Sequence, residues 1–138
     1  MFMLLSITMD NIIAPKIENP RQEFQLFKEK ISRLESQYQK KDVLKEKSEI
    51  AKEALTEHLE EAEDLIDKSY KISEDELRHH AADISEIKSE QGQLAALFEI
   101  AAKKGPLNAF NVVKNLKNPH LFDLFHAEFI KRHDELSG

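Results

Sequence analysis

Two pairs of an acidic residue and a histidine are the side chains whose type and spacing come closest to a recognisable chemistry. They are Glu76 with His79 and Asp123 with His126, each pair one helical turn apart. In helical bundles, such pairs hold di-iron sites together with inward carboxylates from other helices. The chain has 26 acids and six histidines among its 138 residues, however, so about one such pair is expected by chance. We therefore predict no metal site and no cofactor.

Covalent catalysis has even less support in the sequence. The chain contains no cysteine, which excludes thiolate catalysis and cysteine-bound zinc. It also contains no glycine-rich phosphate loop and no Gly-x-Ser-x-Gly elbow, the two short motifs that would place a phosphate or a nucleophilic serine. The sequence thus predicts a protein that is not an enzyme.

The charge balance disfavours binding to nucleic acid. The formal net charge is −6, whereas affinity for a phosphate backbone comes from lysine and arginine side chains that displace counterions. Residues 101–120 are an exception to the acidic character of the chain, because they include four lysines and no acidic residue. These are Lys103, Lys104, Lys114 and Lys117. They keep a small DNA- or RNA-binding regulator open as the alternative function.

The elements that must position these side chains are expected to be helices. Charged residues make up 33% of the chain, which contains only three glycines and four prolines, a composition typical of long solvated helices. We divide the all-α chain into residues 1–18, 19–104 and 105–138. The first is an apolar segment, extended or docked, without a basic residue before Lys16. We expect neither a secretory signal nor a membrane span, and together with the missing cysteine this favours a cytoplasmic protein.

Residues 19–104 are predicted to form a long antiparallel coiled-coil hairpin with helices over 20–70 and 74–104. Asn19 and Pro20 begin the first helix, and the capping pair Ser73 and Glu76 begins the second. The apolar seams on either side of Ser73 differ in phase by one residue, which favours a turn near residues 68–73. The phase slip near residues 40–42 is interpreted as a bend. One continuous helix through Ser73 remains the alternative, because no glycine or proline marks the turn.

Two shorter helices are predicted in residues 105–138. Gly105 with Pro106 and Asn118 with Pro119 are stop and start signals for helices over about 106–116 and 119–135. We expect these helices to form a small head by packing on apolar residues of the first helix, which are Phe24, Phe27, Ile31 and Leu34.

The last helix carries an apolar arc wider than one neighbouring helix can cover. Its residues are Leu121, Phe122, Leu124, Phe125, Phe129 and Ile130, and the first five are the predicted contact residues. Because large apolar patches on a surface usually mark binding sites, we predict that a protein partner or a second copy of the chain binds there. The expected function is a non-enzymatic protein–protein interaction or scaffold protein, which acts through its coiled coil and its apolar helix faces.

Overall fold

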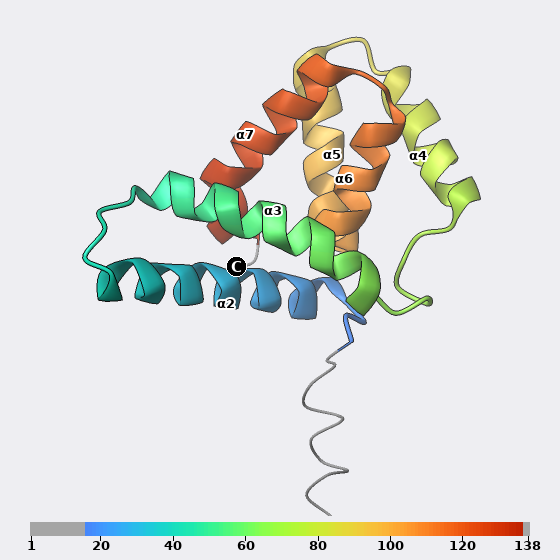
Figure 1. Ribbon diagram of the computed structural model, residues 1–138. Helices are drawn as coiled ribbons and strands as arrows, with labels where there is room; N and C mark the ends of the chain where they lie inside the picture. Colours follow the sequence, from blue (N-terminus) through green and yellow to red (C-terminus); the bar gives the residue numbers. More distant parts are fainter. Residues whose placement is uncertain (1–15, 137–138) are drawn as a thin grey trace, which may run out of the picture.

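The computed structural model describes residues 16–136, and this part of the chain contains six helices and no strands. In Figure 1, α2 and α3 lie side by side as a horizontal pair, and the later helices stand above them. The prediction of an all-α fold is confirmed. The helices are α2 (Pro20–Lys40), α3 (Lys47–Leu65), α4 (Glu74–Ser85), α5 (Glu90–Lys104), α6 (Pro106–Asn115) and α7 (Pro119–Leu136).

The hairpin of this structure is formed by α2 and α3, and its turn falls where the sequence suggests only a bend. The helix expected over 20–70 ends at Lys40 and begins again at Lys47. Asp42 adopts a left-handed conformation with φ of 57°. The Val43 amide donates to the Tyr38 carbonyl at 2.9 Å, and the Asp42 amide donates to the Gln39 carbonyl at 3.1 Å. These two bonds form a Schellman closure, in which an aspartate takes the place usually held by glycine.

The region 74–104, expected to be one helix, is divided into α4 and α5. The hydroxyl of Ser89 accepts the Gly92 amide at 3.0 Å and begins α5, while the Gln93 side chain donates to the carbonyls of Ile84 and Ile87. The close helix partners of α3 are α2, α6 and α7, and those of α4 are α5 and α6. The predicted long coiled coil of residues 20–70 with residues 74–104 is therefore not confirmed.

The predicted starts of the other helices depend on local capping and agree with the structure. The Asn19 side chain accepts the Gln22 amide at 2.9 Å at the start of α2. The Ser73 hydroxyl accepts the Glu76 amide at 3.1 Å before α4, and the Asn118 side chain accepts the Leu121 amide at 3.1 Å before α7. Each bond satisfies one of the amides that a helix leaves free in its first turn.

Aromatic side chains join the C-terminal helices to α2. The Phe129 ring of α7 lies 6.4 Å from that of Phe24 and 5.8 Å from that of Phe27, measured between centroids. Phe110 of α6 contacts Phe125 and Phe129 at 4.7 and 5.6 Å. All five rings are buried. These rings form one continuous aromatic core shared by α2, α6 and α7.

The N-terminal segment enters the described part of the chain beside the end of α3. Ile17 is fully buried, and its amide donates to the Leu65 carbonyl at 2.8 Å while its own carbonyl accepts the Asp67 amide at 2.8 Å. Residues 1–15 of the predicted apolar segment lie outside the described residues. Within residues 16–136, no helix has the length and apolarity that crossing a bilayer requires.

Candidate functional site

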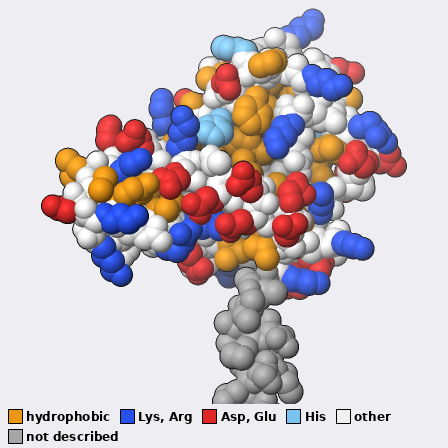
Figure 2. Space-filling view, in the orientation of Figure 1, with side chains coloured by type: hydrophobic (Ala, Val, Ile, Leu, Met, Phe, Trp, Pro, Cys, Tyr) orange, Lys and Arg blue, Asp and Glu red, His pale blue; other side chains and the backbone are white. Residues whose placement is uncertain are grey.

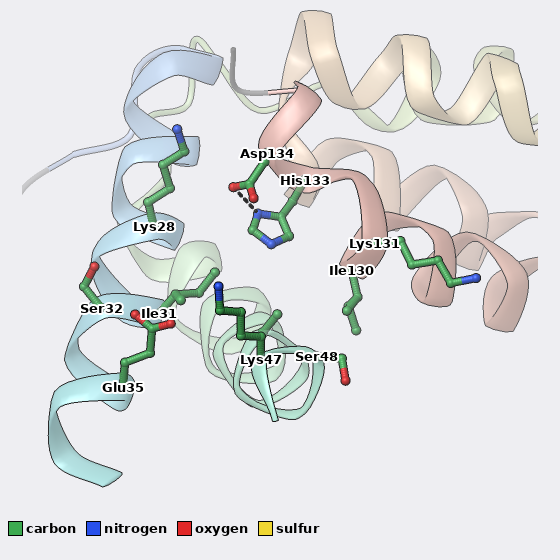
Figure 3. Close-up of a pocket in the computed structure, with 11 residues that line it drawn as sticks. Lys28, Ile31, Ser32, Glu35, Lys47, Ser48, Ile130, Lys131, His133 and Asp134 are labelled. Atoms are coloured by element: carbon green, nitrogen blue, oxygen red, sulfur yellow. Dashed lines mark ion pairs between the residues drawn. The ribbon is translucent and has the colours of Figure 1, made fainter. Parts of the chain in front are cut away.

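A cleft of about 530 Å³ lies where the hairpin meets the C-terminal end of α7 (Figure 3). One wall is a stretch of α2, the second is the first turn of α3, and the third is the end of α7. The residues of the three walls are Lys28, Ile31, Ser32 and Glu35 from α2, Lys47, Ser48 and Ala51 from α3, and Ile130, Lys131, His133 and Asp134 from α7.

The inner side of this cleft is apolar. Ile31 and Ile130 are half-buried and pack against the main core, and Ala51 is buried at the α3 wall. A methyl side chain at residue 51 fills little of the space between the helices, which leaves room for a group from outside. Apolar surface within a recess, with charged groups around it, is the usual composition of a protein-binding pocket.

His133 closes one end of the cleft as a largely buried imidazole. Its ring stands edge-on to Phe27, at 5.2 Å between centroids and 87° between planes. Nδ1 lies 3.3 Å from a carboxylate oxygen of Asp134, but the contact lacks the geometry of a hydrogen bond. Burial lowers the pKa of His133, and the charge of Lys28 lowers it further, against the opposite effect of Asp134. The imidazole is therefore neutral at neutral pH.

Two ammonium groups at the cleft have no acidic partner. No carboxylate of the described residues lies within 4.0 Å of Lys28 or Lys47. In Figure 3, the Lys47 side chain extends between the α2 and α7 walls, whereas Lys131 points away from the cleft. Lys131 also forms an ion pair with Glu128 at 3.6 Å. The cleft thus offers two available positive charges beside an apolar floor, with Glu35 as the acid on the α2 wall.

A second polar cluster lies inside the protein, around Glu23 of α2. Its carboxylate is fully buried and accepts three hydrogen bonds. The donors are His58 Nε2 at 2.8 Å, the Leu107 amide at 2.7 Å and the Tyr70 hydroxyl at 3.0 Å. A carboxylate can only accept, so the His58 ring carries its proton on Nε2. Burial, followed by the charge of Glu23, raises the pKa of Tyr70 well above its usual range.

The Glu23 cluster joins four parts of the chain: α2, α3, the segment after α3, and the first turn of α6. Gly105 makes the close approach possible. Its φ is 90°, and a Cβ atom built there would collide with the Tyr70 hydroxyl and the Glu23 carboxylate. Because Glu23 and His58 have almost no exposed surface, no ligand can reach the cluster in this structure. We interpret the cluster as structural.

The residues predicted to bind a partner on the last helix do not form one exposed patch. Leu121, Phe125 and Phe129 are buried within the chain, and Phe122 and Leu124 are half-buried. Phe122 lies over His126 and edge-on to Phe110. The other helices therefore cover most of the wide apolar arc.

The residues predicted to contact nucleic acid are also divided. Lys103 forms an ion pair with Glu99 at 2.9 Å and Lys104 with Glu76 at 3.6 Å, whereas Lys114 and Lys117 are exposed. The acid–histidine pairs are not brought together with further ligands. Among residues 16–136, no cluster of three or more candidate ligands could hold a metal ion.

Sequence reasoning missed both Glu23 and the cleft. Glu23 had a readable signal, because it stands four residues before Phe27 and eleven before Leu34, and these spacings share one helix face. The cleft had no comparable signal, since its walls come from three helices whose contact depends on the turn after Lys40. No family model, curated protein or solved structure matches the chain.

Proposed function

We propose that the protein is a non-enzymatic interaction or scaffold protein, and that it receives a side chain of a protein partner in the cleft between α2, α3 and α7. The observation that carries the proposal is the cleft itself, with its apolar floor and the unpaired ammonium groups of Lys28 and Lys47. An apolar anchor buried in a recess is the feature on which the affinity of many interfaces depends.

The proposed contact lies nearer the C-terminal end of α7 than the contact predicted from the sequence. Of the five residues predicted there, only Phe122 and Leu124 retain partial exposure, while Ile130 lines the cleft near the helix end. A partner segment that fits should carry a large apolar residue for the floor and a nearby acid for Lys28 and Lys47. Contacts around the rim must supply the rest of the interface, because a stable one buries about 800 Å² on each side.

The proposal is tested by reversing the two unpaired charges in the variant Lys28→Glu/Lys47→Glu. The matched control is Lys68→Glu/Lys88→Glu, which makes the same change in net charge at two exposed positions outside the cleft. Crosslinked capture from extract identifies the partner, light scattering detects self-association, and calorimetry with the purified partner gives the Kd.

We expect the unmodified chain and the control to bind equally and the cleft variant to bind at least roughly tenfold more weakly, since two charge-assisted contacts are lost. Far-UV circular dichroism establishes that both variants remain folded. Equal weakening in the two variants would show a general charge effect and remove the support for the cleft. A monomer that captures nothing would contradict the function.

A further inference from the structure

The turn of the α2–α3 hairpin exposes two large apolar side chains. Leu44 is 102% exposed and Val43 is 44% exposed, and they are the exposed large hydrophobic residues of the described chain. We call residues 40–47 the hairpin tip. In Figure 1 the tip lies at the far left, away from α4, α5 and α6, and in Figure 2 this end of the molecule shows apolar side chains beside basic ones.

The hairpin tip is basic although the whole chain is acidic. It contains four lysines and two acids, and all six side chains are exposed: Lys40, Lys41, Lys45 and Lys47 with Asp42 and Glu46. Four positive and two negative charges give +2, against −6 for the whole chain. Within residues 16–136, none of these lysines lies within 4.0 Å of a carboxylate. Lys45 instead stands over the Tyr38 ring at 5.0 Å.

This arrangement differs from the middle of the same hairpin. There, Lys30 pairs with Glu61, and Arg33 pairs with Glu57 at 2.7 Å, in each case from α2 to α3. Lys30 and Arg33 therefore hold the two helices together, whereas the lysines of the tip are available to an external anion.

The amides just before Leu44 are hydrogen-bonded within the chain. The amides of Lys41, Asp42 and Val43 donate to the carbonyls of Gln37, Gln39 and Tyr38 at 3.2, 3.1 and 2.9 Å. An apolar medium penalises free amide groups. Because the amides that precede Leu44 are already bonded, the turn can place its apolar side chains in such a medium without breaking these hydrogen bonds.

We propose that the hairpin tip binds the surface of anionic lipid bilayers, with Val43 and Leu44 inserted among the acyl chains and the lysines on lipid head groups. A convex turn with two apolar residues is too small for a specific protein interface, which needs shape complementarity over a large area. A lipid surface needs no matching shape. Apolar burial and attraction of lysines to anionic head groups contribute additively there. The acidic remainder of the chain would favour an orientation with the tip toward the membrane.

The absence of tryptophan from the chain allows a direct test in the full-length protein. The variant Leu44→Trp places one fluorophore at the hairpin tip, and Ala95→Trp places one at an exposed position of α5 as the control. We expect vesicles of equal parts phosphatidylserine and phosphatidylcholine to shift the emission of Trp at position 44 to shorter wavelength. The control should not shift, and neither variant should respond to pure phosphatidylcholine.

Cosedimentation with the same vesicles separates the two contributions. Val43→Ser/Leu44→Ser should abolish binding, and it cannot unfold the chain through Leu44, which makes little contact. Lys41→Gln/Lys45→Gln should lower the partition coefficient about 30-fold, which corresponds to ~1 kcal/mol for each lysine. The matched control Lys68→Gln/Lys88→Gln removes two exposed lysines elsewhere and should bind nearly as well as the unmodified chain.

Three results would overturn the proposal. The first is no spectral shift at millimolar lipid, and the second is equal binding to neutral and anionic vesicles. The third is a crosslink from position 44 to a protein in extract without any binding to vesicles, which would assign the tip to a protein partner. The cleft is tested with different residues and without lipid, so failure of the lipid proposal leaves the proposed function standing.

Discussion

The carboxylate of Glu23 should be one of the largest single contributors to stability in the described chain. Glu23→Ala removes the acceptor of three hydrogen bonds and leaves the donors of His58, Tyr70 and Leu107 around a small cavity. An unsatisfied buried donor costs about 1–3 kcal/mol, but Tyr70 is half-buried and can turn to water. We therefore expect a loss of about 3–5 kcal/mol, the range seen when one partner of a buried polar pair is removed.

Glu23→Gln gives a second and more discriminating expectation. The glutamine oxygen can accept from His58 and Leu107, both of which bond to the same carboxylate oxygen, Oε2. The amide nitrogen then faces the Tyr70 hydroxyl, which can rotate and accept. Because all three bonds can be rebuilt in weaker form, we expect a loss of only about 1–2 kcal/mol.

The assay is urea unfolding followed by far-UV circular dichroism, with thermal unfolding as a second measure. The alanine variant should lower Tm by roughly 10–20 °C, and the slope of free energy against urea should remain unchanged. Glu60→Ala, at an exposed position of α3, is the control and should change stability by less than about 0.5 kcal/mol. A loss below about 1 kcal/mol for Glu23→Ala would refute the buried cluster.

Four further expectations follow from the same structure. Gly105→Ala should destabilise by at least roughly 2 kcal/mol in urea unfolding, because φ is 90° and the new Cβ would meet Tyr70 and Glu23; an unchanged midpoint would contradict this packing. Asp42→Gly should stabilise by up to about 1 kcal/mol, since φ is 57°, and a loss would contradict the left-handed turn. Because the pKa of Tyr70 is raised in the folded state, its contribution to stability should be complete below roughly pH 10 and should decrease at higher pH. In denaturation curves across alkaline pH, Tyr70→Phe should therefore lose less stability with rising pH than the unmodified chain. An identical loss in the two proteins would contradict the raised pKa. Phe125→Ala should cost about 3–5 kcal/mol in thermal unfolding, because the ring is fully buried, whereas an unshifted midpoint would place it at the surface.

The starts of α2, α4, α6 and α7 could be predicted from the sequence because their causes are local, whereas those of α3 and α5 were missed. Ser73, Pro106 and Pro119 each lie within three residues of the groups they affect, and the helices begin where these residues indicate. The burial of Phe24 and Phe27 on one face of their helix could also be predicted, since the spacing of apolar residues identifies the buried face of a single helix.

The path of the chain between helices could not be predicted in the same way. The turn after Lys40 contains neither glycine nor proline, because Asp42 takes the left-handed position. A single helix over residues 20–70 would pair with residues 74–104, whereas in the structure His58 of α3 bonds Glu23 of α2. Because this one turn was not recognised, the helix contacts that depend on it could not be predicted, and these include the contacts that form the walls of the cleft.

Glu23 and the hairpin tip show how the two ends of α2 differ in physical role. At the first end, Glu23 is buried with three donors, and Ile17 is bonded to the chain on both sides of Ile66. At the other end, Leu44 contacts little and the neighbouring lysines are unpaired. Contacts that fix the hairpin thus lie at its base and along its body, and its most exposed apolar group lies at its tip. A base fixed by these contacts and a projecting tip can present Leu44 to an external surface without disturbing the core, which is the arrangement that the proposed lipid contact requires.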